Sequence, residues 1–279
     1  MSSQTIELSI IVPVYNEAAI LEDEMTALAA HLDTVVGSGR WQFVFGENGS
    51  TDSTPQIIDR MIERWPTCIC VPLDRPDYGN ALHESLKAAN GEWAFIINVD
   101  FWDEAFLRWC YAYCNVYQLI LGSKRADSTL NQQQRYRRTL SWGLNTILQF
   151  VFGFTGSDTH GQKFLHLPSM RPILEQTILR RGQYDTEFTL RALRMGYWMA
   201  EVPVPIIEVR RQKNLMIQKI LRNIRDVLRL RRIMKGVPFQ GSLRYHRWAR
   251  ADVVTIDEDL CRAMDAHAHK VQSVTTAET

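Results

Sequence analysis

The sequence predicts an α/β fold with a mainly parallel sheet and helices on both faces. Apolar, strand-like runs alternate with segments whose apolar residues recur at helical spacing, as in residues 8–14 and 17–36. The run 8–14 is apolar and rich in β-branched residues, which is typical of a strand buried on both faces. Turn residues stop the expected helices, as at Asn90-Gly91.

Each element is expected from its own local pattern. Strands are expected at 8–14, 41–45, 68–73, 93–99, 119–123 and 198–204, and helices at 17–36, 53–65, 79–90, 106–117, 140–154, 186–195 and 214–235. Pro55 fits the first turn of its helix, and the polar, basic residues 124–139 are expected to form a loop. Because ligands bind at the carboxyl ends of parallel strands, we expect the functional site there.

Length and composition limit the class of protein. With 279 residues, 46% of them hydrophobic, the chain holds one large α/β domain or two small ones around a substantial core. Its cysteines, an odd number without a small-domain disulfide framework, favour reduced thiols in a cytosolic protein. Cys110 and Cys114 have helical spacing, but no second Cys or His pair has zinc-finger spacing, so buried structural thiols are favoured.

Charge is segregated along the chain. Residues 210–250 carry 13 Lys and Arg against the single acid Asp226, whereas residues 1–209 carry 17 basic and 24 acidic residues. Such a block indicates an anionic partner, either a membrane surface or a nucleic acid. Apolar positions share one face of the helix expected at 214–235, namely Ile217, Ile220, Leu221, Ile224 and Leu228. This pattern favours an anionic membrane surface and no nucleic acid, the alternative being a stripe packed on the domain or a second subunit.

Neither a signal peptide nor a spanning helix is predicted. Residues 1–7 lack a basic start and an apolar core, and no uninterrupted apolar run of about 18 residues exists. We therefore expect a cytoplasmic protein, peripheral at the cytoplasmic face of a membrane. The expected organisation is a catalytic domain over 1–211, a basic amphipathic helical extension over 212–265 and a flexible tail over 266–279.

Polar residues follow the first two expected strands and indicate a nucleotide pocket. A base or ribose needs hydrogen-bonding groups at strand ends and a backbone that comes close. The candidates are Pro13, Tyr15, Asn16, Glu17, Glu47, Asn48 and Gly49. The alternative is an ordinary turn with a helix N-cap at Ser50 or Thr51. The flanking strands favour the pocket.

The order and spacing of the motifs resemble family 2 glycosyltransferases, which have a Rossmann-like GT-A fold. The motifs are Ser9–Glu17, Glu47–Thr54, Phe95–Asp100, Asp158–Gly161, Tyr184–Glu187 and Glu201–Pro203. The likeness is greatest to dolichyl-phosphate mannose synthases and related polyprenyl-phosphate sugar synthases, and it covers about residues 7–211. It implies an inverting transfer of a sugar from a GDP- or UDP-sugar donor to a polyprenyl phosphate or related acceptor. The protein would supply positioning and charge neutralisation.

The resemblance also implies a divalent metal, Mg²⁺ or Mn²⁺, held by an Asp-x-Asp motif with the donor diphosphate. This chain has Asn98-Val99-Asp100, with Trp102 where the family often has Gln. Asp103 is either a substitute ligand or a helix cap. The site could bind metal through a neutral carbonyl, catalyse with little metal beside Lys and Arg, or lack transferase activity. We favour the first, with weakened affinity.

The resemblance assigns the remaining site residues by position. Catalytic roles go to Asp100, Asp158, Lys124 and Arg137, nucleotide contacts extend to Asn98 and Val99, and metal contacts go to Asp100 and Asn98. Acceptor contacts go to Ser141, Gly161, Lys163, Asp185 and Arg210. Glu201 is expected to be mostly structural.

A second hypothesis is a non-catalytic nucleotide-sugar-binding protein of the same fold with a degenerate metal motif. Asn48, Asn98 and Trp102 favour it. The retained acids Asp100 and Asp158 disfavour it, together with the basic residues Lys124 and Arg137 and with Gly161.

Overall fold

A computed structural model of the chain describes residues 5–123, 149–205, 216–239, 244–249, 252–253 and 258; within the helix that starts at 216, side chains are described from 225 onward. The elements in chain order are β1 (Leu8–Val14), α1 (Leu21–Val35), β2 (Trp41–Glu47), α2 (Thr54–Arg64), β3 (Ile69–Pro72), α3 (Tyr78–Ala88), β4 (Trp93–Ile96), α4 (Glu104–Ala112), β5 (Leu119–Ser123), β6 (Lys163–His166), α6 (Leu167–Gln176), α7 (Tyr184–Arg194), β7 (Met199–Pro203), α8 (Met216–Lys235) and β8 (Tyr245–Arg247).

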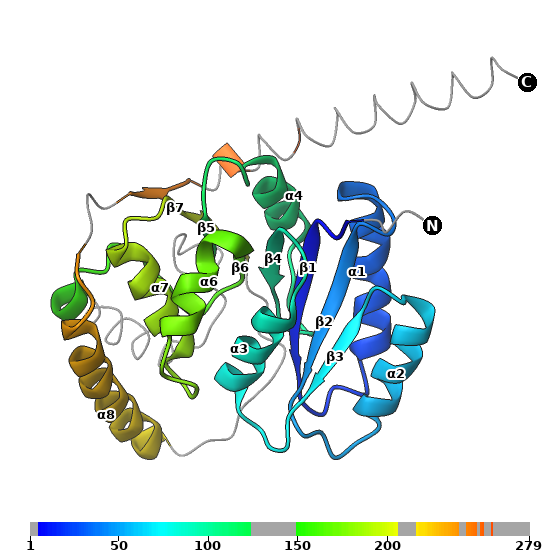
Figure 1. Ribbon diagram of the computed structural model, residues 1–279, viewed down its shortest axis with the longest axis horizontal. Coiled ribbons are helices and arrows are strands. Elements are labelled where there is room, and N and C mark those ends of the chain that lie inside the picture. Colours follow the sequence, from blue (N-terminus) through cyan, green and yellow to red (C-terminus); the bar gives the residue numbers. More distant parts are fainter. Residues whose placement is uncertain are drawn as a thin grey trace, which may run out of the picture.

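The described strands form one sheet in the order β3-β2-β1-β4-β6-β5-β7-β8 (Figure 1). β6 runs antiparallel to β4 and β5, while the other neighbouring strands pair in parallel. The predicted α/β class with a mainly parallel sheet is therefore confirmed.

β1 lies between β2 and β4 and is buried on both faces. Ile10 and Val12 face a core that is covered by α1, α2 and α4. Ile11 faces the opposite core, to which α3, α6, α7 and α8 contribute. Its partners are held in parallel register, so that Val14 pairs with Glu47 and the ends of neighbouring strands meet at one edge. This edge carries the candidate site.

The structure departs from the predicted elements at β4 and in elements that were not predicted. The strand expected at 93–99 ends at Ile96, because the chain then turns at Asn98–Phe101. The short elements β6, α6 and β8 were not predicted. Of the helix expected at 140–154, residues 149–152 are helical and those up to 148 lie outside the described residues.

The expected C-terminal extension contains a strand as well as a helix. β8 pairs in parallel with β7, placing Tyr245 opposite Met199 and Arg247 opposite Glu201. Within the described part of α8, Val227, Leu230 and Met234 are buried, and this part of the helix packs on α7. These buried positions are not members of the predicted stripe, for which packing on the domain stays a prediction. Leu228, the described member of the face predicted to meet a membrane, is 54% exposed.

No helix in the described ranges combines the length and apolar character that a bilayer crossing requires. The four described cysteines are free thiols, of which Cys68 and Cys110 are buried. Burial raises the pKa of the Cys68 thiol to about 11, so it stays protonated and unreactive at neutral pH.

A buried histidine joins α3 to the segment before α7. His83 is 5% exposed, and its Nε2 accepts a hydrogen bond from the Arg180 guanidinium at 3.0 Å. Only a neutral imidazole can accept this bond. Burial, and then the positive charge of Arg180, lower the pKa of His83 to about 4 from an ordinary value of 6.5.

The fold should therefore lose stability in mild acid through His83. Between about pH 6.5 and pH 4 the unfolded chain binds a proton at this position and the native chain does not, so stability falls as the pH falls, by at most about 3 kcal/mol. Chemical denaturation at several pH values tests this. His83→Gln, which keeps an acceptor for Arg180 and does not titrate, should have a shallower pH dependence. Equal slopes in the two proteins would contradict the assignment.

Candidate functional site

The candidate site lies at the carboxyl edge of the sheet, where β1, β2 and β4 end. β6 begins at the same edge, because Ile96 pairs with Lys163 in the antiparallel ladder. The loops that follow β1, β2 and β4, and the loop that precedes β6, are therefore neighbours. These are the segments that carry most of the predicted residues.

The loops after β1 and β2 are locked together by side-chain to backbone hydrogen bonds. Asn16 has a positive φ of 54°, a conformation that Asn tolerates better than most residues. Its Oδ1 accepts from Thr51 N at 2.7 Å, and its N donates to Ser50 Oγ at 3.0 Å. Glu17 N donates to Thr54 Oγ1 at 2.9 Å. The interlock leaves the side chains of Tyr15 and Asn16 exposed at the edge, while Pro13 is half-buried.

Glu47 and Asn48 shape the loops through buried oxygens. The Glu47 carboxylate accepts from Gly49 N at 3.2 Å and from Ser50 N at 2.6 Å. Asn48 Oδ1 accepts from Asp77 N at 2.7 Å, which ties β2 to the start of α3. Both side chains are buried, so the turn of the alternative describes their contacts, whereas the N-cap of α2 is Ser53 and not Ser50 or Thr51. Their predicted role in binding a nucleotide would be to hold the wall of the pocket.

Gly49 is required by backbone conformation and by close packing. Its φ is +73°, and a Cβ there would lie 3.3 Å from Leu73 O and 3.2 Å from Arg75 Cα. The loop after β3 therefore presses on the predicted nucleotide motif. Sequence reasoning missed this third loop, although Asp77 is a recognisable cap: it accepts from Asn80 N at 3.3 Å at the start of α3.

The metal motif forms a tight turn. Phe101 N donates to Asn98 O at 3.1 Å, and the turn leaves Asn98 and Asp100 exposed while Val99 is buried. Asp103 accepts from Phe106 N at 2.7 Å and caps α4, so the capping alternative describes its contact. Trp102 stands where the family often has Gln, and its Nε1 donates to Glu24 Oε2 on α1 at 3.1 Å. An indole offers no oxygen to a metal ion.

Among the described residues, no group of three or more His, Cys, Asp or Glu side chains is arranged to hold a metal ion. The exposed pair Asn98 and Asp100 nevertheless fits a hard divalent cation, because both offer oxygen and they sit two residues apart on one turn. Two protein ligands suffice where substrate phosphates and water supply the others. The carbonyl oxygen of Asn98 would bind more weakly than a carboxylate.

The loop before β6 packs tightly against β5 and the metal turn. A Cβ at Gly161 would lie 1.8 Å from Gly122 O, so only glycine fits. Gln162 Nε2 donates to Phe101 O at 3.2 Å. Asp158 is 7% exposed; its Oδ1 accepts from His160 N at 2.9 Å, and its buried Oδ2 has no hydrogen-bond partner among the described residues. An unpaired buried carboxylate oxygen is costly, so it marks a position where a donor is expected.

Lys163 and Asp185, both predicted to contact an acceptor, contact each other. Lys163 Nζ lies 2.6 Å from Asp185 Oδ1 and also donates to Gly161 O at 3.0 Å. Their side chains are 2% and 5% exposed, so the two charges neutralise each other inside the protein. The pair fixes the loop on α7, and breaking it would cost about 3–5 kcal/mol. In this conformation neither side chain faces an acceptor.

Lys124, Arg137, Ser141 and Arg210 lie outside the described residues. The predicted basic part of the site stays a prediction.

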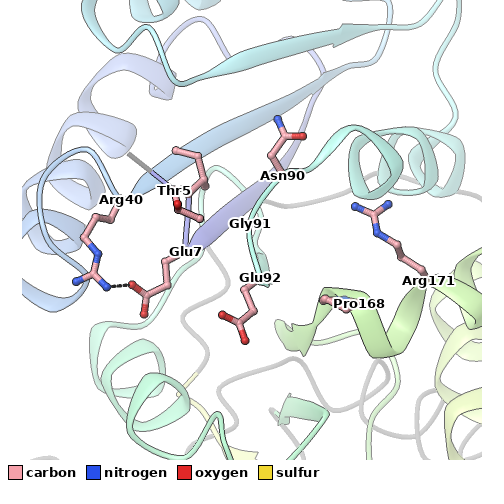
Figure 2. A pocket seen from close by; sticks show the side chains of 9 residues that line it. Thr5, Glu7, Arg40, Asn90, Gly91, Glu92, Pro168 and Arg171 are labelled. Carbon is pink, nitrogen blue, oxygen red and sulfur yellow. Dashed lines mark hydrogen bonds and ion pairs between the residues drawn. The ribbon is translucent and has the colours of Figure 1, made fainter. Parts of the chain in front are cut away.

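A hollow of about 690 Å³ lies at the opposite edge of the sheet, where strands begin (Figure 2). Arg40 and Glu7 form an ion pair in its wall, Arg171 donates to Ala89 O at 3.1 Å, and Glu92 lies 3.7 Å from His166. Its charged side chains thus have partners of their own. It is separate from the edge that collects the predicted residues.

A comparison with family models decides the family. The model of glycosyl transferase family 2 matches residues 9–165, which is more than half of the chain. The chain belongs to glycosyl transferase family 2.

The curated relative that this family 2 chain matches is distant in sequence. It is 24% identical over 215 residues to "Glycosyltransferase AglD" from Haloferax volcanii, a match that covers 71% of this chain and 33% of the relative. The chain thus spans about a third of the length of the curated relative it matches.

Two solved structures share the fold. One is glucosyl-3-phosphoglycerate synthase from Mycobacterium tuberculosis in complex with Mn²⁺, UDP and glucosyl-3-phosphoglycerate; the TM-score is 0.53 and the identity 19%, over 85% of this chain and 82% of that one. The other is the mannosyltransferase PcManGT from Pyrobaculum calidifontis with GDP-Man and Mn²⁺, at a TM-score of 0.51 and 17% identity, over 97% and 79% of the two chains.

Restoring a carboxylate at Asn98 should strengthen the metal site. Asn98→Asp adds a charged oxygen beside Asp100, so Mn²⁺ should bind on the order of tenfold more tightly. Isothermal titration of MnCl₂ in the presence of UDP or GDP measures the effect. Asn115→Asp, an exposed asparagine between α4 and β5, is the matched control and should not change affinity. Absence of Mn²⁺ binding in both the wild type and Asn98→Asp would count against a metal at this turn.

Proposed function

We propose that this family 2 chain is an inverting glycosyltransferase that moves a sugar from a GDP- or UDP-sugar to a polyprenyl phosphate or a related phosphate acceptor. The observation that carries the proposal is the meeting of the interlocked loops after β1 and β2 with the exposed Asn98–Phe101 turn at one edge of the sheet. A nucleotide diphosphate needs this combination of a shaped loop and an adjacent cation site.

The donor would lie across the loops after β1, β2 and β4. Exposed Tyr15 and the side-chain amide nitrogen of Asn16 would face the base and ribose, while Asn16 Oδ1, Glu47 and Asn48 keep the loops in shape. The shared fold supports this placement, since the two solved relatives were crystallised with UDP or GDP-Man. Which of the two nucleotides this chain binds is part of the test.

Asn98 and Asp100 would hold Mg²⁺ or Mn²⁺ together with the donor diphosphate. The metal supplies charge neutralisation for the departing nucleoside diphosphate. Asp100 contributes the one charged ligand of this pair, so the loss of its carboxylate should be felt mainly in the transition state.

The acceptor would approach from the side of the loop before β6 and attack the anomeric carbon opposite the leaving group. A phosphate oxygen is already nucleophilic, so it requires positioning and little proton removal. Asp158, one of whose oxygens is buried and lacks a partner in the described ranges, would orient a cation that binds the acceptor phosphate. Lys124 follows Ser123 directly in the sequence and is the first candidate for that cation.

The test is Asp100→Ala. We expect sugar transfer to fall by about 100-fold or more with the fold intact, because one charge-stabilising ligand is lost from an exposed turn. Transfer from UDP- and GDP-sugars to a polyprenyl phosphate is measured beside circular dichroism. Asp59→Ala, an exposed acid on α2, is the control. Near-full activity in Asp100→Ala would reject the centre, whereas nucleotide binding without transfer by the wild type would favour the non-catalytic hypothesis.

A lipid-linked acceptor requires the protein to approach a bilayer, and the described half of α8 offers a suitable face. Its exposed side chains are Arg225, Leu228, Arg229, Arg231, Arg232 and Lys235, followed by Phe239 at 58% exposed. Each basic group near an anionic surface contributes about 1 kcal/mol, and the apolar groups can enter the headgroup region. The opposite face of the helix is occupied by packing through Leu230 and Met234.

The protein should therefore float with anionic liposomes at low salt and dissociate as the salt rises. Reversing three charges, with Arg229→Glu, Arg232→Glu and Lys235→Glu, should abolish flotation, because about 3 kcal/mol of attraction becomes repulsion. A control with Arg60→Glu, Arg64→Glu and Lys87→Glu changes net charge equally on other elements. Equal loss in both triple variants would point to net charge alone, and no flotation of the folded wild type would reject the surface.

A further inference from the structure

Glu201 is a fully buried carboxylate that joins two segments far apart in the sequence. Its Oε2 accepts from Ser157 N at 2.8 Å and from the Tyr245 hydroxyl at 2.6 Å. Its Oε1 accepts from Ser157 Oγ and lies 3.7 Å from Arg247 Nε. The side chain is 0% exposed. Sequence reasoning gave this residue a general structural role and did not single out Tyr245.

The geometry shows which part of the site this cluster holds. Ser157 precedes Asp158, and its hydroxyl also bonds Ser123 Oγ at 2.7 Å at the end of β5. A Cβ at Gly156 would lie 2.2 Å from the Tyr245 hydroxyl and 2.9 Å from Glu201 Oε2. The loop backbone is thus pressed directly onto the Tyr245–Glu201 pair. Burying a carboxylate is unfavourable unless hydrogen bonds compensate, so Glu201 and its donors are expected to hold one another in a fixed arrangement.

We propose that Glu201 and Tyr245 are positioning residues, which hold the loop of residues 156–162 so that Asp158 can orient the cation that binds the acceptor phosphate. The strand β8, which lies beyond the segment matched by the family model, would thereby be part of the catalytic unit. Tyr245 acts as a donor to Glu201, and Glu201 holds the amide and hydroxyl of Ser157. The inference about Asp158 rests on the proposed function, whereas the inference about the loop does not.

Hydrogen–deuterium exchange tests the loop directly, because the Ser157 amide is one of the donors to Glu201. Tyr245→Phe keeps the ring, which packs on Phe154, and removes only the hydroxyl. We expect amides of residues 156–162 to exchange about tenfold faster, the change that corresponds to one lost hydrogen bond. Glu201→Gln should accelerate them at least as much.

Tyr117→Phe is the matched control. It removes the hydrogen bond from Tyr117 to His246, the neighbour of Tyr245 in the same strand, at 3.1 Å. It should destabilise β8 comparably without accelerating exchange in 156–162. In a transfer assay, Tyr245→Phe should lower kcat about tenfold and leave the donor KM unchanged, because the donor loops belong to other strands, whereas Tyr117→Phe should leave kcat near the wild-type value.

The outcomes separate the two proposals. Wild-type exchange rates in the loop of Tyr245→Phe would overturn the positioning role, whatever the activity. Equal acceleration in Tyr117→Phe would also overturn it, since the effect would then follow from loosening of the strand. If the wild type transfers no sugar, the proposed function fails and the exchange measurement still decides the role of Tyr245. If Glu201→Gln does not fold, the single hydroxyl removed in Tyr245→Phe carries the test.

Discussion

The parallel pairing of β1 with β2 and β4 is the constraint on which the site depends. β1 is buried on both faces, so a slip of one residue would turn Ile10 and Val12 into the core that Ile11 fills, and Ile11 into theirs. With the register fixed, Val14 lies opposite Glu47, and Asn48 N reaches Val14 O at 2.9 Å. The three loops then emerge side by side, and hydrogen bonds such as Thr51 N to Asn16 Oδ1 become possible. The packing of the sheet thus determines how the loops are placed.

The parallel half of the fold could be predicted because its signal is local. Each strand there is a short apolar run, and a helix with its own stop follows it. β6 escaped prediction because it is only four residues long and begins with Lys163, a charge that reads as a loop residue. Its burial depends on Asp185, twenty-two positions later, and no local pattern reports such a partner. β8 was missed for the same reason: three residues gain a place in the sheet only from β7.

The strand ends that carry the candidate site were predicted, whereas the contacts of its side chains were predicted only in part. The sequence indicated which strand ends carry oxygen atoms, but not which of those side chains are buried by their own turn. The Glu47 carboxylate accepts hydrogen bonds from the amides of its own turn, whereas the side chains of Asn98 and Asp100 are exposed on theirs. The sequence pattern is the same in both cases, namely a polar residue that follows a buried strand. The direction of the side chain is set by the turn that follows, which the sequence pattern does not report.

The loop of residues 156–162 is held in place by buried contacts, although one carboxylate oxygen within it has no partner among the described residues. Residues 156–162 are held by Glu201 behind Ser157, by Lys163 at the start of β6 and by Gly122 beneath Gly161. Within this loop Asp158 keeps one buried oxygen unpaired among the described residues. Flexible loops can turn such an oxygen to water, whereas this loop is fixed on both sides. Within the described part of the chain this oxygen is thus held in place without a donor, and a donor that reached it would meet a loop that is already ordered.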